Sequence, residues 1–304
     1  MARPIAKTSQ TAVPFLIACA GLASFSAMDA VMKGLSLAIG AYNAVFWRCL
    51  FGCAISGAAF VLTRAAWPGR AALAIHVWRG MVVSVVAVLF FWAIARLPLA
   101  EAIALTFVSP LLALYLAAIL LGERIGRDAI VASLLGVAGV GVILAGRFGD
   151  GEWPADAPLA VAALFGSALL FAYNLILARR QALIAKPLEI AFFQSLVMAA
   201  CLGLAAPLLA VLPGAEHAPA LAGAAVLTIV SLLLLSWAYA RAEAQVLIPV
   251  EYTGFVWAAL LGWWFFDEAL TLPVVVGAAL IVAGSLIAAR RSGQSGPHVE
   301  QAAV

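Results

Sequence analysis

The sequence contains few charged residues. Only 10% of its 304 residues are Asp, Glu, Lys or Arg, whereas 66% are hydrophobic. A soluble domain carries roughly 25% charged residues, so a chain of this composition cannot cover a folded surface with polar groups. A bilayer core about 30 Å thick needs roughly 20 apolar residues per helix. The composition therefore excludes a soluble globular protein and predicts an all-α integral membrane protein of about ten transmembrane helices.

Residues that build metal centres and catalytic clusters are also scarce. The three histidines are far apart in the sequence, and the four cysteines all lie inside apolar runs. Cysteines in such runs behave as small hydrophobic residues and not as a disulfide or metal framework. The chain has no Gly-rich phosphate loop, so direct use of ATP is not expected. We predict no metal and no cofactor, and a membrane-embedded enzyme or a sensor subunit is only a weaker alternative.

Lys and Arg are distributed unevenly between the predicted loops. With the amino terminus in the cytoplasm, 13 lie on the cytoplasmic side, three lie outside and Arg48 lies within a helix, which accounts for all 17. This asymmetry predicts that both termini are cytoplasmic. The basic residues form no stripe suited to nucleic acid. The predicted spans are 12–32, 43–62, 75–95, 98–121, 128–146, 157–178, 189–211, 219–240, 244–266 and 271–289.

The two halves of the chain resemble each other at an offset of about 145 residues. The segment from Trp92 to Arg96 then aligns with the segment from Trp237 to Arg241, and Asp29 aligns with Asn174. Matches at Trp, Arg and Asp indicate a duplication and not merely a shared Ala-rich composition. Because five helices per copy is an odd number, the second copy must enter the membrane from the opposite side. The predicted domains are two inverted five-helix repeats at 12–146 and 157–289, with a short cytoplasmic tail at 292–304.

Polar and ionisable residues inside the predicted spans are candidate site residues. A charge near the bilayer centre costs a few kcal/mol even on permissive scales, so such groups usually face the interior of a bundle. There they either line a cavity or pair with a neighbouring helix, and both interpretations stay open here. The outer group is Asp29, Lys33, Arg48 and Glu101, and the inner group is Asn174, Gln194, Glu251 and Tyr252, with His76 and Arg79 at the start of the third helix.

Four of these residues lie near predicted helix ends. Asp29 and Lys33 are four residues apart at the end of the first span. This spacing favours a local interfacial pair, because a lysine there can extend to water. His76, Arg79 and Lys33 are weaker candidates for a gate or a proton relay.

Prolines and aromatic residues add further candidates. Pro110 and Pro249 interrupt the fourth and ninth helices, which are equivalent in the two halves. Each proline removes a backbone hydrogen bond and leaves a carbonyl free for a ligand or a neighbouring helix. Aromatic side chains within the spans could meet an aromatic substrate, although ordinary packing against helices and lipid explains them as well. These residues are Phe46, Trp47, Trp92, Tyr173, Tyr252 and Trp257.

Several short segments around these candidate residues together resemble the EamA family of the drug/metabolite transporter superfamily. The resemblance covers the whole chain and implies ten helices, two inverted repeats, a central cavity and transport of a small metabolite across a bacterial inner membrane. Similar members export amino acids, including aromatic ones, and others take up S-adenosylmethionine or riboflavin. The segments are Phe46-Trp47-Arg48, Leu97 to Ala102 with Ser109-Pro110, Leu121 to Arg124, Pro249 to Thr253 and Asp267-Glu268.

The favoured function is therefore amino-acid efflux by a secondary transporter with alternating access, and the alternative is uptake of S-adenosylmethionine or a riboflavin-like metabolite. A zwitterionic substrate needs a cation for its carboxylate and an anion for its amine, which Arg48 with Glu101 or Glu251 could supply. Partners are the lipid bilayer and a small-molecule substrate. Glycines in the fifth and tenth helices suit close helix packing or a homodimer contact. Substrate, direction, ion coupling and oligomeric state stay open.

Overall fold

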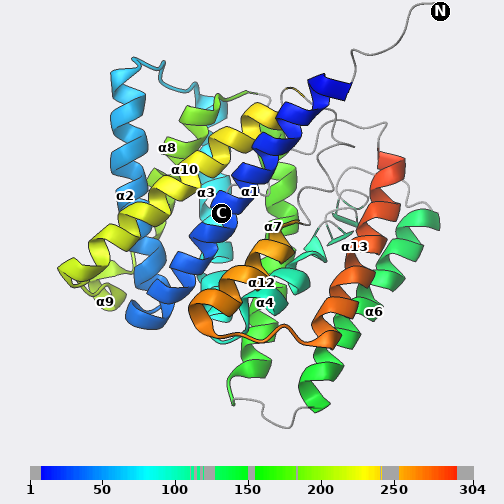
Figure 1. Ribbon diagram of the computed structural model, residues 1–304. Helices are drawn as coiled ribbons and strands as arrows, with labels where there is room; N and C mark the ends of the chain where they lie inside the picture. The colour runs from blue at the N-terminus through cyan, green and yellow to red at the C-terminus, as the bar shows by residue number, and fades with distance from the viewer. Residues whose placement is uncertain are drawn as a thin grey trace, which may run out of the picture.

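The computed structural model describes residues 8–109, 111–112, 115–116, 119, 127–149, 155–182, 184–239, 241 and 253–292. This part of the chain is helical and contains no strand, as Figure 1 shows. Five of its helices are long and apolar enough to cross a membrane, and four more are shorter apolar helices. These nine helices and α4 correspond one to one to the ten predicted spans. The fold class predicted from composition is confirmed.

The first repeat contributes five of these helices. A single residue, Gly40, separates the first two, and its φ of 80° is a conformation that glycine adopts without steric cost. Pro98 precedes α4, where a proline can stop one helix and begin the next. The helices are α1 (Thr8–Ile39), α2 (Ala41–Leu62), α3 (Arg70–Ile94), α4 (Leu99–Thr106) and α6 (Arg127–Gly149).

The second repeat has the same order of helices. Pro187 begins α8, and its fixed φ and missing N–H suit the first turn of a helix. Two short elements, α9 (Ala206–Leu209) and the 3-10 helix η1 (Ala215–His217), connect α8 to α10. The helices are α7 (Ala157–Ala182), α8 (Pro187–Gly203), α10 (Ala218–Tyr239), α12 (Thr253–Phe266) and α13 (Leu272–Ser292).

Contacts between helices repeat when the two halves are exchanged. Helix α1 packs on α10, and its counterpart α7 packs on α3. Helix α2 packs on α10, and its counterpart α8 packs on α3. The pairs α2–α8 and α6–α13 each join equivalent helices. The two halves are therefore related by a pseudo-two-fold axis that passes through these two pairs, as an inverted repeat requires.

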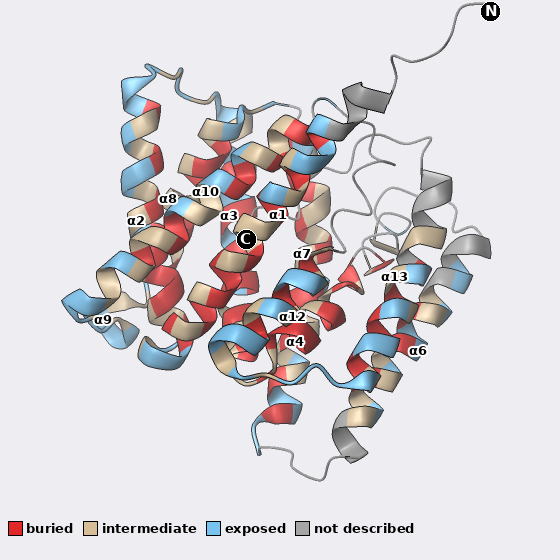
Figure 2. Ribbon diagram, viewed as in Figure 1, coloured by how far each residue is buried: buried red, intermediate tan, exposed pale blue. Residues whose placement is uncertain are grey.

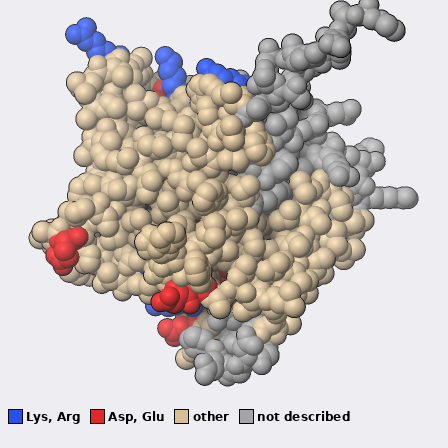
Figure 3. All heavy atoms as spheres, viewed as in Figure 1, with Lys and Arg blue, Asp and Glu red and all other residues tan. Residues whose placement is uncertain are grey.

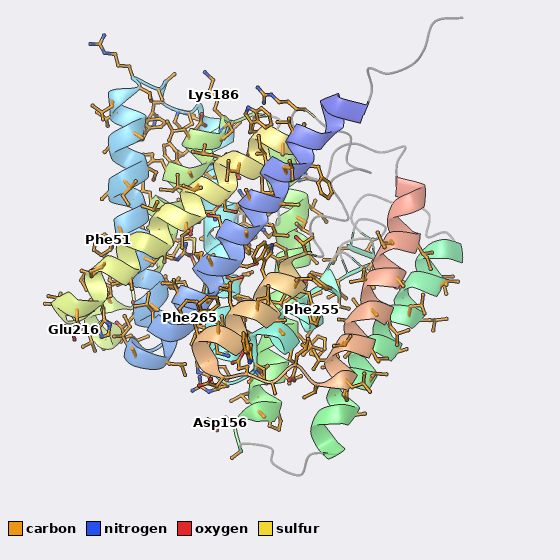
Figure 4. All side chains as sticks on the ribbon, in the orientation of Figure 1. Phe51, Asp156, Lys186, Glu216, Phe255 and Phe265 are labelled. Carbon is orange, nitrogen blue, oxygen red and sulfur yellow. The ribbon has the colours of Figure 1, made fainter. Side chains whose placement is uncertain are left out.

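One side-chain motif occurs at both ends of the bundle. The Arg96 guanidinium lies 3.8 Å from the Trp92 ring, and the Arg241 guanidinium lies 4.2 Å from the Trp237 ring. Each arginine also donates a hydrogen bond to the carbonyl of its tryptophan. Arg96 lies 3.6 Å from Asp156, which Figure 4 shows at the lower end of the bundle. Arg241 follows the last residue of α10, and Figure 1 shows that α10 ends at the upper end. Equivalent motifs at opposite ends confirm that the repeats are inverted.

On the face shown in Figure 3, charged side chains gather near the two ends, with most Lys and Arg at the upper end and most Asp and Glu at the lower end. Figure 4 places Lys186 at the upper end and Asp156 and Glu216 at the lower end. We call these the Lys186 end and the Asp156 end. Between them, Figure 2 shows buried residues facing inward, and large apolar side chains such as Val230 and Trp264 are exposed. An apolar belt of this kind suits the hydrocarbon core of a bilayer.

Several helix boundaries differ from the predicted ones. Helix α1 continues to Ile39 instead of ending at residue 32, because Lys33 is buried inside the bundle and does not mark the membrane surface. Helix α3 begins at Arg70 instead of residue 75, and α8 ends at Gly203 instead of residue 211. Most of the fourth span after residue 109 and the ninth span before residue 253 lie outside the described residues.

Helices α6 and α13 approach each other through two glycines. A Cβ at Gly139 would lie 2.5 Å from the Gly277 carbonyl oxygen, and a Cβ at Gly277 would lie 2.5 Å from the Gly139 carbonyl oxygen. Only residues without side chains permit this approach, which is common between membrane helices.

We therefore expect Gly139→Val to lower the free energy of unfolding by about 1–3 kcal/mol or more, because the new side chain forces the two helices apart. Thermal unfolding of the purified protein in detergent measures this change. Gly141→Val is the matched control, since a Cβ at Gly141 has no neighbour within 4 Å. Equal midpoints for both variants would contradict the expected steric role of Gly139.

Candidate functional site

A cavity lies in the middle of the bundle, between α1, α3, α4, α7 and α12. Helix α1 contributes four residues at positions i, i+3, i+4 and i+7, the spacing that places side chains on one helix face. They are Leu22, Phe25, Ser26 and Asp29. The other lining residues are Val86, Phe90, Ile103, Thr106, Phe107, Ser109, Ser167, Ala168, Phe171 and Gly254.

Aromatic rings and hydroxyl groups make up much of this lining. Four phenyl rings come from three helices and from the segment directly after α4. Flat apolar faces of this kind pack well against aromatic ligands. Two of the hydroxyl groups are already bonded, since Ser167 donates to the Val86 carbonyl at 3.0 Å and Thr106 donates to the Ile103 carbonyl at 2.7 Å. The rings belong to Phe25, Phe90, Phe107 and Phe171.

Two buried polar atoms of the cavity have no hydrogen-bond partner within the described part of the chain. They are Oδ1 of Asp29 and Oγ of Ser109, and both residues are almost completely buried. Leaving such atoms unpaired costs free energy, so they are suited to a ligand that donates and accepts hydrogen bonds. Asp29 is also the one acidic residue among the described residues of the lining. The cavity thus combines aromatic surfaces with one carboxylate.

A network of five polar side chains joins α3, α7 and α8 on the Lys186 side of the cavity. His76 Nε2 lies 2.9 Å from Glu189 Oε1, and His76 Nδ1 lies 2.6 Å from Gln181 Nε2. Arg79 Nε donates to Asn174 Oδ1 at 2.9 Å, and Arg79 Nη1 donates to Gln181 Oε1. Because the Gln181 oxygen accepts from Arg79, its amide nitrogen donates to His76 Nδ1, which leaves Nε2 as the donor to Glu189.

Replacing Arg79 tests this network. Arg79 is 1% exposed, and Arg79→Met removes the donor to the buried oxygens of Asn174 and Gln181. An unpaired buried polar group costs about 1–3 kcal/mol, so we expect a marked fall in the thermal unfolding midpoint. Arg96→Met is the control, because the Arg96 side chain is 33% exposed and its ion pair with Asp156 is worth about 0–1 kcal/mol. Similar losses in the two variants would show that the network adds no particular stability.

A second network lies on the Asp156 side of the cavity. The Lys33 ammonium pairs with Oε1 of Glu268 and donates to the Leu97 carbonyl at 2.6 Å. Oε2 of Glu268 accepts a hydrogen bond from the Leu99 amide at 2.7 Å, at the start of α4. The Phe266 ring lies 5.1 Å from the Lys33 ammonium. This network joins α1, the start of α4 and the segment between α12 and α13.

Each network has a residue about one helical turn from a residue that lines the cavity. Lys33 lies one helical turn beyond Asp29 on α1, toward the Asp156 end. Asn174 lies one turn beyond Phe171 on α7, toward the Lys186 end. Asp29, which lines the cavity, and Asn174, which bonds to Arg79, occupy equivalent positions of the two repeats.

The predicted outer cluster of Asp29, Lys33, Arg48 and Glu101 does not form as one group. Lys33 pairs with Glu268 and not with Asp29, so the predicted interfacial pair is wrong, because α1 continues beyond both residues. Arg48 lines a separate pocket between α2, α8 and α10, together with Gln194. Glu101 is buried and lines a further pocket at the Asp156 end, together with Glu268.

The five aromatic candidates in the described part of the chain are not among the residues that line the central cavity. Phe46 is buried against Tyr42 and Trp47, and Trp47 donates to the Val211 carbonyl at 2.9 Å. Tyr173 accepts a hydrogen bond from Trp78 at 3.0 Å. The Arg96 guanidinium lies over the Trp92 ring, and Trp257 is 36% exposed on α12. Glu251, Tyr252, Pro110 and Pro249 lie outside the described residues, so their roles stay predictions.

Sequence reasoning missed the four phenylalanines of the cavity. A phenylalanine that faces lipid and one that faces a cavity have the same local sequence pattern, so composition and hydropathy cannot separate them. One signal was available for α1, since Phe25 and Asp29 are four residues apart and share a helix face.

Comparisons with known proteins give relatives along nearly the whole chain. A profile of the EamA-like transporter family matches residues 13–145 and 158–290. The riboflavin transporter of Rhizobium johnstonii is 33% identical over 282 residues, which cover 89% of this chain and 88% of that protein. A pseudopaline exporter of Pseudomonas aeruginosa is 27% identical over 282 residues, which cover 90% of this chain and 95% of that protein. A solved crystal structure shares the fold with a TM-score of 0.61 and 23% identity, over 92% of this chain and 98% of that one.

The matched stretches correspond to the two five-helix halves, one stretch for each half. The named relatives are transporters from bacteria, one for riboflavin and one for pseudopaline. An apolar belt, inverted repeats and a central cavity that holds a buried carboxylate agree with such a protein. This chain belongs to the EamA-like transporter family and is a multi-pass membrane transporter of a small molecule.

Proposed function

We propose that the protein is a secondary transporter that moves an aromatic metabolite with hydrogen-bond donor groups through the central cavity by alternating access. The observation that supports this most is the cavity itself, which is lined by four phenyl rings and the Asp29 carboxylate. The two flanking networks support the mechanism, because opening one while the other stays closed would expose the cavity to one side at a time. The proposed location is the bacterial inner membrane, with the Lys186 end in the cytoplasm.

A riboflavin-like metabolite is the first candidate substrate. Its planar ring system could stack on the phenyl rings, and its hydroxyl and N–H groups could donate to Asp29. The relative of 33% identity that is named a riboflavin transporter supports this class. The corresponding direction is uptake.

Efflux of an aromatic amino acid is the second candidate. An ammonium group would form a charge-assisted hydrogen bond with Asp29, and the side chain would meet the phenyl rings. The substrate carboxylate would then bond to hydroxyl groups such as that of Ser109, because Arg48 lines a different pocket. The relative that is named an exporter supports the direction.

Counterflow in proteoliposomes of the purified protein tests the proposal. Vesicles loaded with unlabelled riboflavin, tryptophan, phenylalanine or S-adenosylmethionine are diluted into trace labelled compound, and saturable accumulation is measured. We expect accumulation of riboflavin or of the aromatic amino acids. Accumulation of neither, by protein whose helicity and single-species elution show that it is folded, would overturn the aromatic substrate class.

A further inference from the structure

We propose that the pocket between α2, α8 and α10 is a second binding site, separate from the central cavity, and that it takes a carboxylate through Arg48. The pocket is lined by residues of these three helices, and Arg48 is 5% exposed there. Arg48 lies seven residues after the start of α2, about 10 Å along the helix axis and so inside the apolar belt. Neither the proposed transport path nor its aromatic substrate requires this pocket.

The two nitrogens of Arg48 that have no partner in the described part of the chain share one edge of its guanidinium group. Nη1 donates to the Thr228 hydroxyl at 3.2 Å, and that hydroxyl donates in turn to the Ala224 carbonyl at 2.8 Å. Nε and Nη2 have no hydrogen-bond partner among the described residues. The N–H groups of Nε and Nη2 point in parallel, and their spacing matches the two oxygens of a carboxylate. The tether to Thr228 thus leaves unpaired, among the described residues, the edge that binds carboxylates in a bidentate manner.

The charge of Arg48 also lacks a direct counter-charge in the described part of the chain. Among the described residues, its side chain donates a hydrogen bond to the neutral Thr228 hydroxyl. The Asp29 carboxylate acts on Arg48 electrostatically, but no hydrogen bond or ion pair joins the two groups. A buried guanidinium is costly unless an anion compensates its charge and its hydrogen-bond donors. A bound carboxylate supplies both.

The rest of the pocket suits a carboxylate that has an apolar body. Apolar walls come from Ala191, Met198, Ala225 and Leu232, beside the hydroxyl of Ser195. The outward face of α10 next to the pocket is exposed and apolar at Val226, Val230 and Leu233. A ligand could therefore be a water-soluble aromatic acid or the head of a fatty acid that enters from the bilayer. Both present the same group to Arg48.

Ligand-induced stabilisation distinguishes these sources. The full-length protein, in nanodiscs of a neutral phospholipid at constant ionic strength, is titrated with benzoate or laurate, and the thermal unfolding midpoint is followed. Benzyl alcohol and dodecanol are the matched ligands without a carboxylate. We expect one or both carboxylates to raise the midpoint in a saturable manner and the alcohols to leave it unchanged. A response to laurate alone assigns a fatty acid, and a response to benzoate assigns a soluble acid.

Variants connect the response to Arg48. Arg48→Gln removes the positive charge and the two parallel N–H donors, and we expect the stabilisation by carboxylates to disappear. Arg48→Lys keeps the buried positive charge but lacks the two parallel N–H donors. We therefore expect the apparent dissociation constant of the carboxylate to be at least about tenfold higher. Arg96→Gln, at an arginine outside the pocket, should respond as the unaltered protein does. No response to either carboxylate, equal responses to the alcohols, or an unchanged response in Arg48→Lys would overturn the proposal.

Discussion

Replacing Asp29 with Asn is expected to lower the rate of substrate transport by roughly 10- to 100-fold at low substrate concentration. Hydrogen bonds to a charged group contribute about 1.5–3 kcal/mol, and each 1.4 kcal/mol corresponds to a factor of ten in affinity. The asparagine keeps the size of the side chain and removes the charge that an ammonium, hydroxyl or N–H donor of the substrate would meet. Because Asp29 Oδ1 has no protein partner among the described residues, the folded state loses no hydrogen bond in the exchange.

Initial rates of counterflow in proteoliposomes measure this effect, with the amount of inserted protein determined separately. Asp156→Asn is the matched control, because the Asp156 side chain is 66% exposed at the end of the bundle and far from the cavity lining. A thermal unfolding midpoint close to that of the unaltered protein would show that the loss is one of substrate binding. If the two variants transported at equal rates, Asp29 would not be a substrate-binding residue.

The architecture could be predicted from the sequence because its determinants are local. Apolar runs of about 20 residues identify membrane helices wherever they lie in the chain, and the Trp92 and Trp237 segments carry the duplication in their own residues. An odd number of helices per copy then requires inversion. The end of α1 was misplaced because Lys33 looks like a surface residue in sequence, whereas the fold surrounds it with Glu268 and Leu97.

The partners of the candidate site residues could not be predicted, because they depend on how distant helices pack. Asn174, Arg79 and His76 were singled out individually, but the network requires Gln181 and Glu189, which the sequence gives no reason to select. Arg48 and Asp29 seemed to belong together by depth, yet they line different pockets. Depth along a helix can be read from a sequence, whereas the direction in which a side chain points depends on its neighbours.

The ion pair between Lys33 and Glu268 is expected to control access to the cavity from the Asp156 end. In Glu268→Gln the lysine loses its counter-charge, and the Leu99 amide keeps only a neutral acceptor. Losing hydrogen bonds of this strength, about 1.5–3 kcal/mol, should shift the equilibrium toward a conformation open at the Asp156 end by roughly 10- to 100-fold. The reverse pair, Lys33→Glu with Glu268→Lys, should recover part of the closed population.

Labelling of a cysteine in the cavity measures this shift. Ser26→Cys, in a chain whose own four cysteines are replaced, is exposed to a membrane-impermeant thiol reagent from each side of the membrane. We expect Glu268→Gln to accelerate labelling from the Asp156 side and to slow it from the Lys186 side, because a conformation open to one side is closed to the other. Asp267→Asn is the control, since Asp267 is the adjacent carboxylate, is exposed, and has a φ of 53° that asparagine tolerates well. Faster labelling from both sides would indicate a loosened bundle, and unchanged labelling would show that this ion pair does not hold the Asp156 end closed.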